Sequence, residues 1–288
     1  MKKFLFFLQV SRPGLWFAAL WLYLLPTSQI QSVWSNFEFW YGIFYVSFPL
    51  NFVVYGWNDI VDREIDKANK RKGNFWFGAK GMESQLSVLW KPIVWSQILF
   101  FTPLVFMSNW KVLLIFALFI LVNALYNLPK NGLRSRPPLE LIAQIGYLLI
   151  VPLSITLNET DPLPFLTYLY LFLFAMQSHL MGEVMDIEPD MQSGRKTTAT
   201  QLGMSKTKVL IMAVVLSEII IVGYYFKEFW FALFLSAALL WLILDLLVLF
   251  KTKMYTLAQM KLFAYASNGI AIASMIYVWW SGCLVHIP

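Results

Sequence analysis

The chain has little charge and a single cysteine. Only 13% of its 288 residues are Asp, Glu, Lys or Arg, whereas soluble domains carry roughly 25%. One cysteine excludes an internal disulfide and a cysteine-based zinc or iron–sulfur site. Hydrophobic residues make up 59% of the chain and aromatic residues 18%, and Trp and Tyr gather at membrane interfaces. This composition is typical of a polytopic membrane protein without a soluble domain.

Apolar segments close to the length of a membrane span, about 20 residues, recur along the whole chain. They predict an all-α membrane protein, a bundle of nine transmembrane helices. A re-entrant pair is the alternative for the third and fourth segments, which only SNW separates. The start, MKKFLFFLQVSRPGLW, has a short apolar run and no cleavage site, so we interpret it as a retained interfacial segment. The expected spans are 14–31, 38–58, 89–108, 111–128, 139–157, 163–185, 208–227, 229–250 and 260–281.

The basic residues indicate how these spans are oriented. If the N-terminus is cytoplasmic and nine spans alternate in direction, all but two of the 22 Lys and Arg residues fall on the cytoplasmic side; the exceptions are Lys111 and Lys227. Such a distribution follows the positive-inside rule. The net charge of +6 is then a property of topology, and nucleic acid is not an expected partner. We expect an integral protein of a bacterial or archaeal cell membrane.

Two acidic clusters follow the second and sixth expected spans. One is NDIVDREID, which begins at Asn58, and the other is GEVMDIEPD, which begins at Gly182. The clusters lie four spans apart, which suggests an internal repeat. We therefore expect one domain over 1–288, built of two related four-helix halves and a ninth helix. A gapless alignment pairs Asp59 with Glu183, Asp62 with Asp186, Glu64 with Glu188, and Asp66 with Asp190.

The spacing of the acids points to a metal. Asn58, Asp62 and Asp66 stand four residues apart, so on a helix they line one face, and Asp186 and Asp190 do the same. Like charges at this spacing repel, so helix stability does not explain them. Magnesium prefers oxygen ligands and is usually bound by one or two carboxylates together with substrate phosphates. The alternative for either cluster alone is a solvated helix end.

Basic residues surround both clusters. Together with carboxylate-bound magnesium they favour a diphosphate ligand, although each one alone is equally explained by the positive-inside rule. A divalent-cation transporter or channel is the competing class, but it requires acids deep in the bilayer. Both clusters lie instead at the cytoplasmic edge. The basic residues are Arg63, Lys130, Arg134, Arg136, Arg195 and Lys196.

With these motifs the chain resembles the UbiA-type intramembrane prenyltransferases. YNLPK, from Tyr126 to Lys130, is similar to the tyrosine and basic loop after the fourth helix of the family, and SRPGLW to its N-terminal Arg-Pro element. The first family motif, N-D-x-x-D-x-x-x-D, matches Asn58, Asp59, Asp62 and Asp66, and the second, D-x-x-x-D, matches Asp186 and Asp190.

The resemblance implies a nine-helix bundle with a central cavity that opens to lipid. Two Mg²⁺ ions would hold an isoprenyl diphosphate, and the prenyl group would pass to a lipophilic acceptor on the cytoplasmic side, without a side-chain nucleophile. The implied metal ligands are Asn58, Asp59, Asp62, Asp66, Asp186 and Asp190, of which the catalytic carboxylates are Asp62, Asp66, Asp186 and Asp190. The implied diphosphate-binding residues are Asn58, Arg63, Tyr126, Lys130, Arg134, Arg136, Arg195 and Lys196.

The acceptor is a finer question. SRPGLW, DKANKRKG, LRSRPPLE, DIEPD and GRKTTAT are most similar to the lycopene-elongase branch, which implies a carotenoid such as lycopene. NKRK and YNLPKNG depart from the usual family runs, and an aromatic acceptor of quinone biosynthesis is the alternative. Three other polar residues lie within spans. His179 lies two turns before Asp186, as a substrate contact or a core histidine, whereas Glu218 and Asp245 receive no role.

Overall fold

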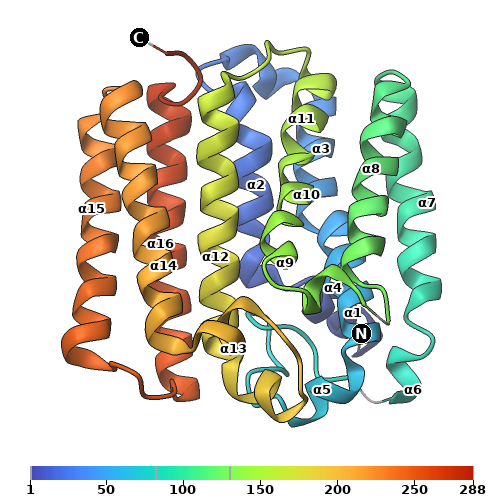
Figure 1. The fold of residues 1–288 in the computed structure, drawn as a ribbon. Helices are drawn as coiled ribbons and strands as arrows, with labels where there is room; N and C mark the ends of the chain where they lie inside the picture. Colours follow the sequence, from blue (N-terminus) through green and yellow to red (C-terminus); the bar gives the residue numbers. More distant parts are fainter. Residues whose placement is uncertain (1, 82, 130, 288) are drawn as a thin grey trace. The chain divides into compact units, whose positions relative to one another are not determined.

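Hydrophobic runs of this length form helices because a helix satisfies its own backbone hydrogen bonds where water is absent. The structure is a computed structural model that describes residues 2–81, 83–129 and 131–287. Within these ranges the regular structure is helical and no β-strand occurs (Figure 1). The chain divides into two compact units: unit 1 comprises Met1–Lys130 and Leu149–Pro162, and unit 2 comprises Asn131–Leu148 and Leu163–Pro288.

Unit 1 contains the first acidic motif. Its longest helices, α7 and α8, are adjacent in sequence and lie side by side (Figure 1). Helix α4 packs on α1, α3 and α7, and α11 packs on α2, α3 and α8. The helices of unit 1 are α1 (Lys2–Val10), α2 (Trp16–Leu24), α3 (Phe37–Ser47), α4 (Pro49–Val61), α5 (Arg63–Ala68), α6 (Glu83–Leu86), α7 (Trp90–Met107), α8 (Lys111–Tyr126) and α11 (Ile150–Asn158).

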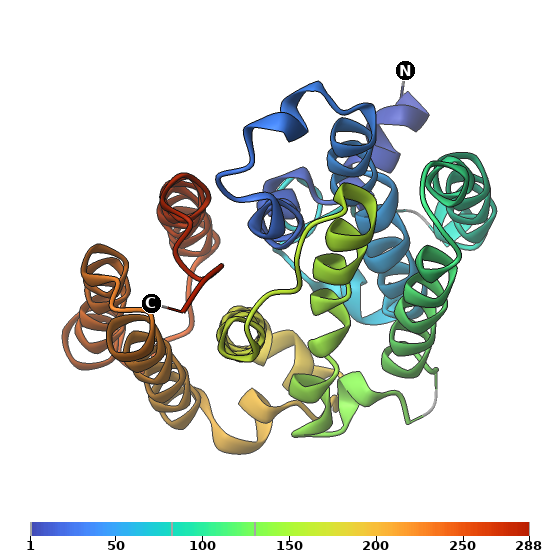
Figure 2. The same cartoon turned by 90° about the horizontal axis from the view of Figure 1, so that it is seen from above.

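Unit 2 contains the second acidic motif. Helix α12 packs on α9, α10, α13 and α14. Helices α14, α15 and α16 lie next to one another in the end-on view (Figure 2). The helices of unit 2 are α9 (Leu139–Ile142), α10 (Ile145–Leu148), α12 (Phe165–Gln192), α13 (Thr198–Leu202), α14 (Met204–Ile220), α15 (Phe229–Leu244) and α16 (Leu257–Ser281), and π-helical turns extend α14 over Ile221–Tyr225 and α15 over Asp245–Leu249.

Eight helical segments of the described chain are long and apolar enough to cross a membrane. The fourth expected span, 111–128, coincides with α8, which is apolar but shorter than these eight segments. The predictions of an all-helical fold and a polytopic membrane protein are therefore confirmed, whereas the count of nine and the cytoplasmic N-terminus stay predictions. The eight segments are Lys3–Thr27, Phe37–Val61, Glu83–Met107, Leu139–Asn158, Phe165–Gln192, Met204–Tyr225, Phe229–Leu249 and Leu257–Ser281.

Two boundaries differ from the expected ones. The segment before Arg12 is helical, so the first apolar segment begins at Lys3 rather than at residue 14; Arg12 interrupts it with a φ of 51°. Helix α12 runs on to Gln192, through Pro189. The second acidic cluster therefore lies on the last turns of a helix and not in the loop that follows it.

Candidate active site

The first motif lies where α4 gives way to α5. Asp62 joins the two helices with φ −89° and ψ 6°, and its N–H donates to the carbonyl of Asn58 at 2.8 Å. The Asp66 N–H donates in turn to the Asp62 carbonyl at 2.9 Å. Because these bonds preserve the four-residue repeat of a helix across the junction, the spacing predicted from the sequence is retained.

Asn58 connects this motif to α8. Its Nδ2 donates to Oδ2 of Asp62 at 3.0 Å and lies 3.3 Å from Oδ1 of Asn127. Asn127 follows the last residue of α8 and donates to Oδ1 of Asn123 at 3.0 Å. This chain of amides orients the Asp62 carboxylate.

Asp59 is the most deeply buried acid of the motif, with 1% of its surface exposed. Its Oδ1 accepts from Nη2 of Arg12 at 2.9 Å and from Nζ of Lys72 at 2.5 Å. Lys72 also lies 3.0 Å from Oδ2 of Asp66, so one ammonium group bridges two carboxylates. The Arg12 guanidinium is stacked over the ring of Tyr55, 4.4 Å from its centroid, an arrangement that favours a cation.

The carboxylates of this cluster lie close to one another, so positive charge near them is stabilising. Burial raises the pKa of Asp66 above its ordinary value, and the nearby Asp59 and Asp62 raise it further, whereas Lys72 opposes them. Oδ2 of Asp59 is buried and receives no hydrogen bond from the residues that the structure describes. Carboxylates that a cation must neutralise are the donors Mg²⁺ prefers, so these residues fit the ion. In the described ranges no three His, Cys, Asp or Glu side chains converge as for a bound metal, and Lys72 supplies the charge.

The second motif occupies the last two turns of α12. Asp186 is half-buried and Asp190 is buried. Nη1 of Arg195 lies 3.6 Å from Oδ1 of Asp190, and the Arg195 N–H donates to the Asp190 carbonyl at 2.9 Å. The turn after α12 thus brings Asp190 and Arg195 together.

Two buried carboxylates hold the start of α13, the short helix after this turn. Oε1 of Glu140 accepts from both the N–H of Thr198, at 2.8 Å, and its hydroxyl, at 2.5 Å. Oε2 of Glu183 accepts from the N–H of Ala199 at 3.0 Å. The first N–H groups of a helix have no partner within the helix, so these acids stabilise α13 and with it the turn that contains Arg195.

The remaining predicted residues differ in their surroundings. Arg63 is partly exposed, with Nε 3.8 Å from Oε1 of the exposed Glu64, which is not one of the predicted metal ligands. Tyr126 is half-buried at the end of α8. Arg134 is buried in a short turn, Leu133–Ser135, of unit 2. Arg136 and Lys196 are exposed, and Lys130 lies outside the described residues.

Three residues of the site were missing from the predicted set: Arg12, Lys72 and Glu140. Arg12 had a signal, because it is the arginine of the Arg-Pro element. Lys72 had none, because it stands in a basic run with Lys70 and Arg71. Glu140 is separated by 58 positions from the threonine that it binds, a contact that no local pattern indicates.

The polar residues within spans mostly tie helices together. Gln177 of α12 donates to Oε2 of Glu218 at 3.0 Å. Asp245 pairs with Lys208 and accepts from the hydroxyl of Tyr255, each at 2.6 Å. These contacts give structural roles to Glu218 and Asp245, to which the sequence analysis assigned no role. The third polar residue within a span, His179, lies beside Glu183.

A family model described as the UbiA prenyltransferase family matches residues 15–268, most of the chain. The chain belongs to the UbiA prenyltransferase family. The family and its reaction class were both predicted from the two acidic motifs, and both predictions are confirmed. The predicted roles of individual side chains are not tested by the match and stay predictions.

Two characterised relatives resemble the chain in sequence. A lycopene elongase/hydratase of Corynebacterium glutamicum is 27% identical over 210 residues, which are 70% of this chain and 71% of the relative. A lycopene elongase/hydratase of Halobacterium salinarum is 29% identical over 161 residues, 55% of this chain and 56% of the relative.

Solved structures share the fold. A UbiA homologue of Archaeoglobus fulgidus bound to DMAPP and Mg²⁺ has a TM-score of 0.67 at 15% identity, and the likeness covers 94% of this chain and 99% of that one. A structure of digeranylgeranylglyceryl phosphate synthase has a TM-score of 0.59 at 19% identity and covers 97% of this chain and 99% of that one. They establish the UbiA fold.

Proposed function

We propose that the chain is a Mg²⁺-dependent prenyltransferase that moves the isoprenyl group of an allylic diphosphate to a carotenoid such as lycopene. The observation that carries the proposal is the first motif, in which the buried Asp59 and the partly buried Asp66 share the ammonium group of Lys72. Buried carboxylates need cations. An A. fulgidus homologue of the same fold is described as bound to DMAPP and Mg²⁺, which supports the choice of ligand.

We assign the carboxylates of both motifs as ligands of two Mg²⁺ ions. Mg²⁺ held by these carboxylates would supply positive charge to stabilise the diphosphate as a leaving group. Asn58 holds Asp62 in one orientation by the bond at 3.0 Å. The ligands we assign are Asn58, Asp59, Asp62, Asp66, Asp186 and Asp190, among which Asp62, Asp66, Asp186 and Asp190 are the catalytic set.

The basic residues near the two motifs are assigned to the diphosphate. Arg195 is the best placed, because it already lies beside Asp190. Arg134 is also assigned; it is buried in the short turn Leu133–Ser135. Arg63, Arg136 and Lys196 have exposed or partly exposed side chains that can reorient toward a ligand. Asn58, Tyr126 and Lys130 complete the proposed set.

The acceptor assignment has separate support. The relatives reported above bear the name lycopene elongase/hydratase, and the sequence motifs favour the same branch. From the distribution of basic residues we place the reaction at the cytoplasmic side of a bacterial or archaeal membrane. The hydrocarbon of both substrates then lies in the bilayer. Prenylation of an aromatic quinone precursor is the second candidate, favoured by the departures in the NKRK and YNLPKNG runs.

The test is an activity assay on the purified full chain in detergent. It would contain Mg²⁺, an allylic diphosphate of five to twenty carbons, and either lycopene or 4-hydroxybenzoate, and would follow diphosphate release and product mass. We expect prenylated lycopene, absent in EDTA, and a fall of about 10²-fold or more in Asp62→Asn and Asp186→Asn, since each loses a metal ligand. Glu64→Gln and Glu188→Gln, exposed acids of the same motifs, are the matched controls.

Each other outcome has a definite meaning. A product from 4-hydroxybenzoate alone would replace the carotenoid with an aromatic acceptor. Normal turnover in EDTA would exclude the magnesium assignment. No diphosphate release with any substrate, together with Mg²⁺ flux in liposomes, would identify a cation transporter and overturn the proposal.

A further inference from the structure

His179 and Glu183 form a titratable pair one turn apart on α12. Nε2 of His179 lies 3.2 Å from Oε1 of Glu183. The other oxygen of Glu183 is fixed by the N–H of Ala199 at 3.0 Å, so the carboxylate has a set orientation. Oε1 itself is buried and receives no hydrogen bond in the described chain. A carboxylate oxygen in that state is stabilised when a proton is added to the imidazole beside it.

The pair lies on the same side of α12 as the second motif. His179 precedes Asp186 by seven residues, nearly two full turns, which returns to the same face and rises about 10 Å along the helix. That rise leads away from the helix end that bears Asp186 and Asp190, into the apolar part of the segment Phe165–Gln192. His179 keeps 21% of its side chain accessible, whereas Glu183 is buried.

The other polar residue at this level does not share the position. Gln177 stands half a turn away from the Asp186 face and bonds to Glu218 of α14, one of the helices packed on α12. Ser178 is exposed and donates to the carbonyl of Phe174 in its own helix. Of these three neighbouring side chains, His179 alone combines a titratable group with the face of the motif.

Prenyl transfer to an alkene needs such a group. The allylic C–O bond breaks and its electron pair leaves with the diphosphate. The π electrons of the acceptor then form the new C–C bond, and the positive charge passes to the neighbouring carbon of the acceptor. That charge is removed when water forms a C–O bond and loses a proton, or when an adjacent C–H bond breaks and its electrons form an alkene. Both endings release one proton, which a base must accept.

We propose that His179 is the base that accepts this terminal proton, and that Glu183 stabilises the imidazolium that results. The inference rests on the proposed function. The diphosphate is bound by polar residues at the end of α12, so the reacting carbons lie on the membrane side of it, toward His179. Protonation gives Oε1 of Glu183 a charge-assisted hydrogen bond in place of a missing one. In the hydroxylated product the released proton comes from the added water, and in the alkene it comes from a C–H bond of the coupled intermediate. The identity of the product therefore shows which proton the base accepts.

The experiment compares His179→Gln and Glu183→Gln with Ser178→Ala in the assay described above. Glutamine at 183 keeps an amide oxygen for the N–H of Ala199, so α13 retains its contact while the charge is lost. Positioned bases contribute at least about 10²-fold. We expect kcat for coupled product to fall by about that factor in His179→Gln, with the KM for diphosphate within about twofold of wild type and diphosphate release continuing through hydrolysis. The kcat for coupled product should fall less in Glu183→Gln, and in Ser178→Ala it should equal the wild-type value.

The ratio of products separates a chemical role from a structural one. A chemical role predicts that the hydroxylated-to-alkene ratio changes in His179→Gln while the thermal midpoint and Mg²⁺ requirement do not. Unchanged kcat and ratio would overturn the inference alone. A raised KM for diphosphate with unchanged kcat would also overturn it, because it indicates a positioning defect in the second motif. Failure of the wild-type chain to couple any acceptor would overturn the proposed function and the inference with it.

Discussion

The ammonium nitrogen of Lys208 on α14 lies 2.6 Å from Oδ2 of Asp245 at the end of α15, and both residues are buried. Lys208 also donates to the carbonyl of Lys251 at 2.8 Å, and its charge lies 4.7 Å from the ring centroid of Tyr255. The pair therefore joins the two helices to the loop that follows α15.

Removing one partner of this pair should destabilise the protein strongly. Lys208→Met leaves the Asp245 carboxylate buried without its cation, which costs about 3–5 kcal/mol. Lys206→Met, an exposed lysine of the same helix, should change nothing. Thermal unfolding in detergent is the measurement.

The double variant Lys208→Met with Asp245→Leu tests the cause. Because it removes both charges, it should recover much of the stability lost in the single variant. A double variant as unstable as Lys208→Met would show that packing around the lysine stem, and not the orphaned charge, sets the cost.

Lys72 should make the protein's stability depend on Mg²⁺ when it is removed. In Lys72→Met, Asp66 loses its cation and Asp59 keeps only Arg12, so the metal-free protein should unfold at a lower temperature than wild type. If these acids bind Mg²⁺, the added ion should raise the midpoint more in Lys72→Met than in wild type.

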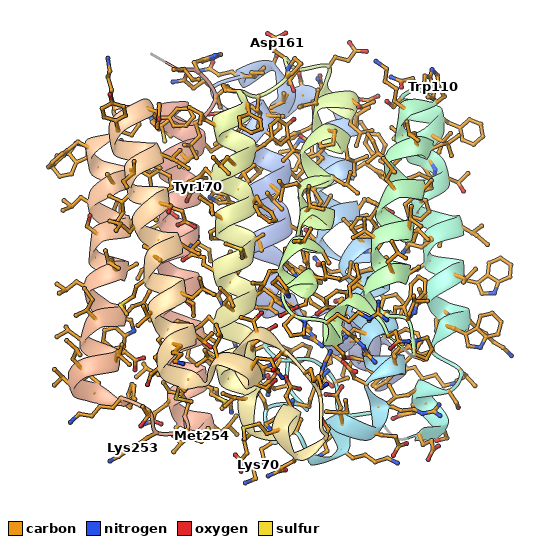
Figure 3. All side chains as sticks on the ribbon, viewed as in Figure 1. Lys70, Trp110, Asp161, Tyr170, Lys253 and Met254 are labelled. Atoms are coloured by element: carbon orange, nitrogen blue, oxygen red, sulfur yellow. The ribbon has the colours of Figure 1, made fainter. Side chains whose placement is uncertain are left out.

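Lys70→Met is the control for this prediction. Lys70 is exposed, lies two positions away and belongs to the same basic run (Figure 3). Equal midpoints for the two variants without Mg²⁺ would contradict the view that Lys72 neutralises the acids.

The sequence alone predicted the features that depend on residues close together in the chain. Apolar runs near 20 residues predicted the spans, because backbone hydrogen bonding in lipid leaves the helix as the fold for such a run. The four-residue spacing predicted that Asn58 and Asp62 are neighbours, and their side chains are hydrogen-bonded.

The sequence did not predict contacts that form only when segments distant in the chain pack together. Lys208 and Asp245 are 37 positions apart, and Lys208 looked like one more cytoplasmic lysine. Lys72 is distinguished from Lys70 only by the fold of the loop that returns it to Asp59. Pro189 would normally predict a helix end, yet α12 continues to Gln192, which places Asp190 on the helix.

The predicted orientation can be tested with single cysteines. Asp161 and Lys70 lie at opposite ends of unit 1 (Figure 3), and the charge pattern predicts that Lys70 is cytoplasmic. A membrane-impermeant maleimide applied to intact cells should label Asp161→Cys but not Lys70→Cys, and inverted vesicles should give the reverse.

The native chain provides the background for this labelling. Burial raises the pKa of Cys283 to about 12, and the thiolate is the reactive form, so wild-type protein should remain unlabelled in both preparations. Labelling of Lys70→Cys in intact cells would place the first motif outside the cell and refute the predicted topology.

The start of α13 offers a test of how the second motif is held. Glu140→Leu leaves the N–H and hydroxyl of Thr198 without their acceptor, which costs about 1–3 kcal/mol and should open the segment from Arg195 onward. Arg195 and Lys196 are adjacent trypsin sites, so cleavage there should accelerate about 10-fold or more, because each 1.4 kcal/mol changes the open population tenfold. Glu140→Gln keeps an oxygen acceptor and should be cut much more slowly than Glu140→Leu. If both variants are cleaved at the wild-type rate, Glu140 does not stabilise the turn, and the position of Arg195 must depend on its own contacts with Asp190.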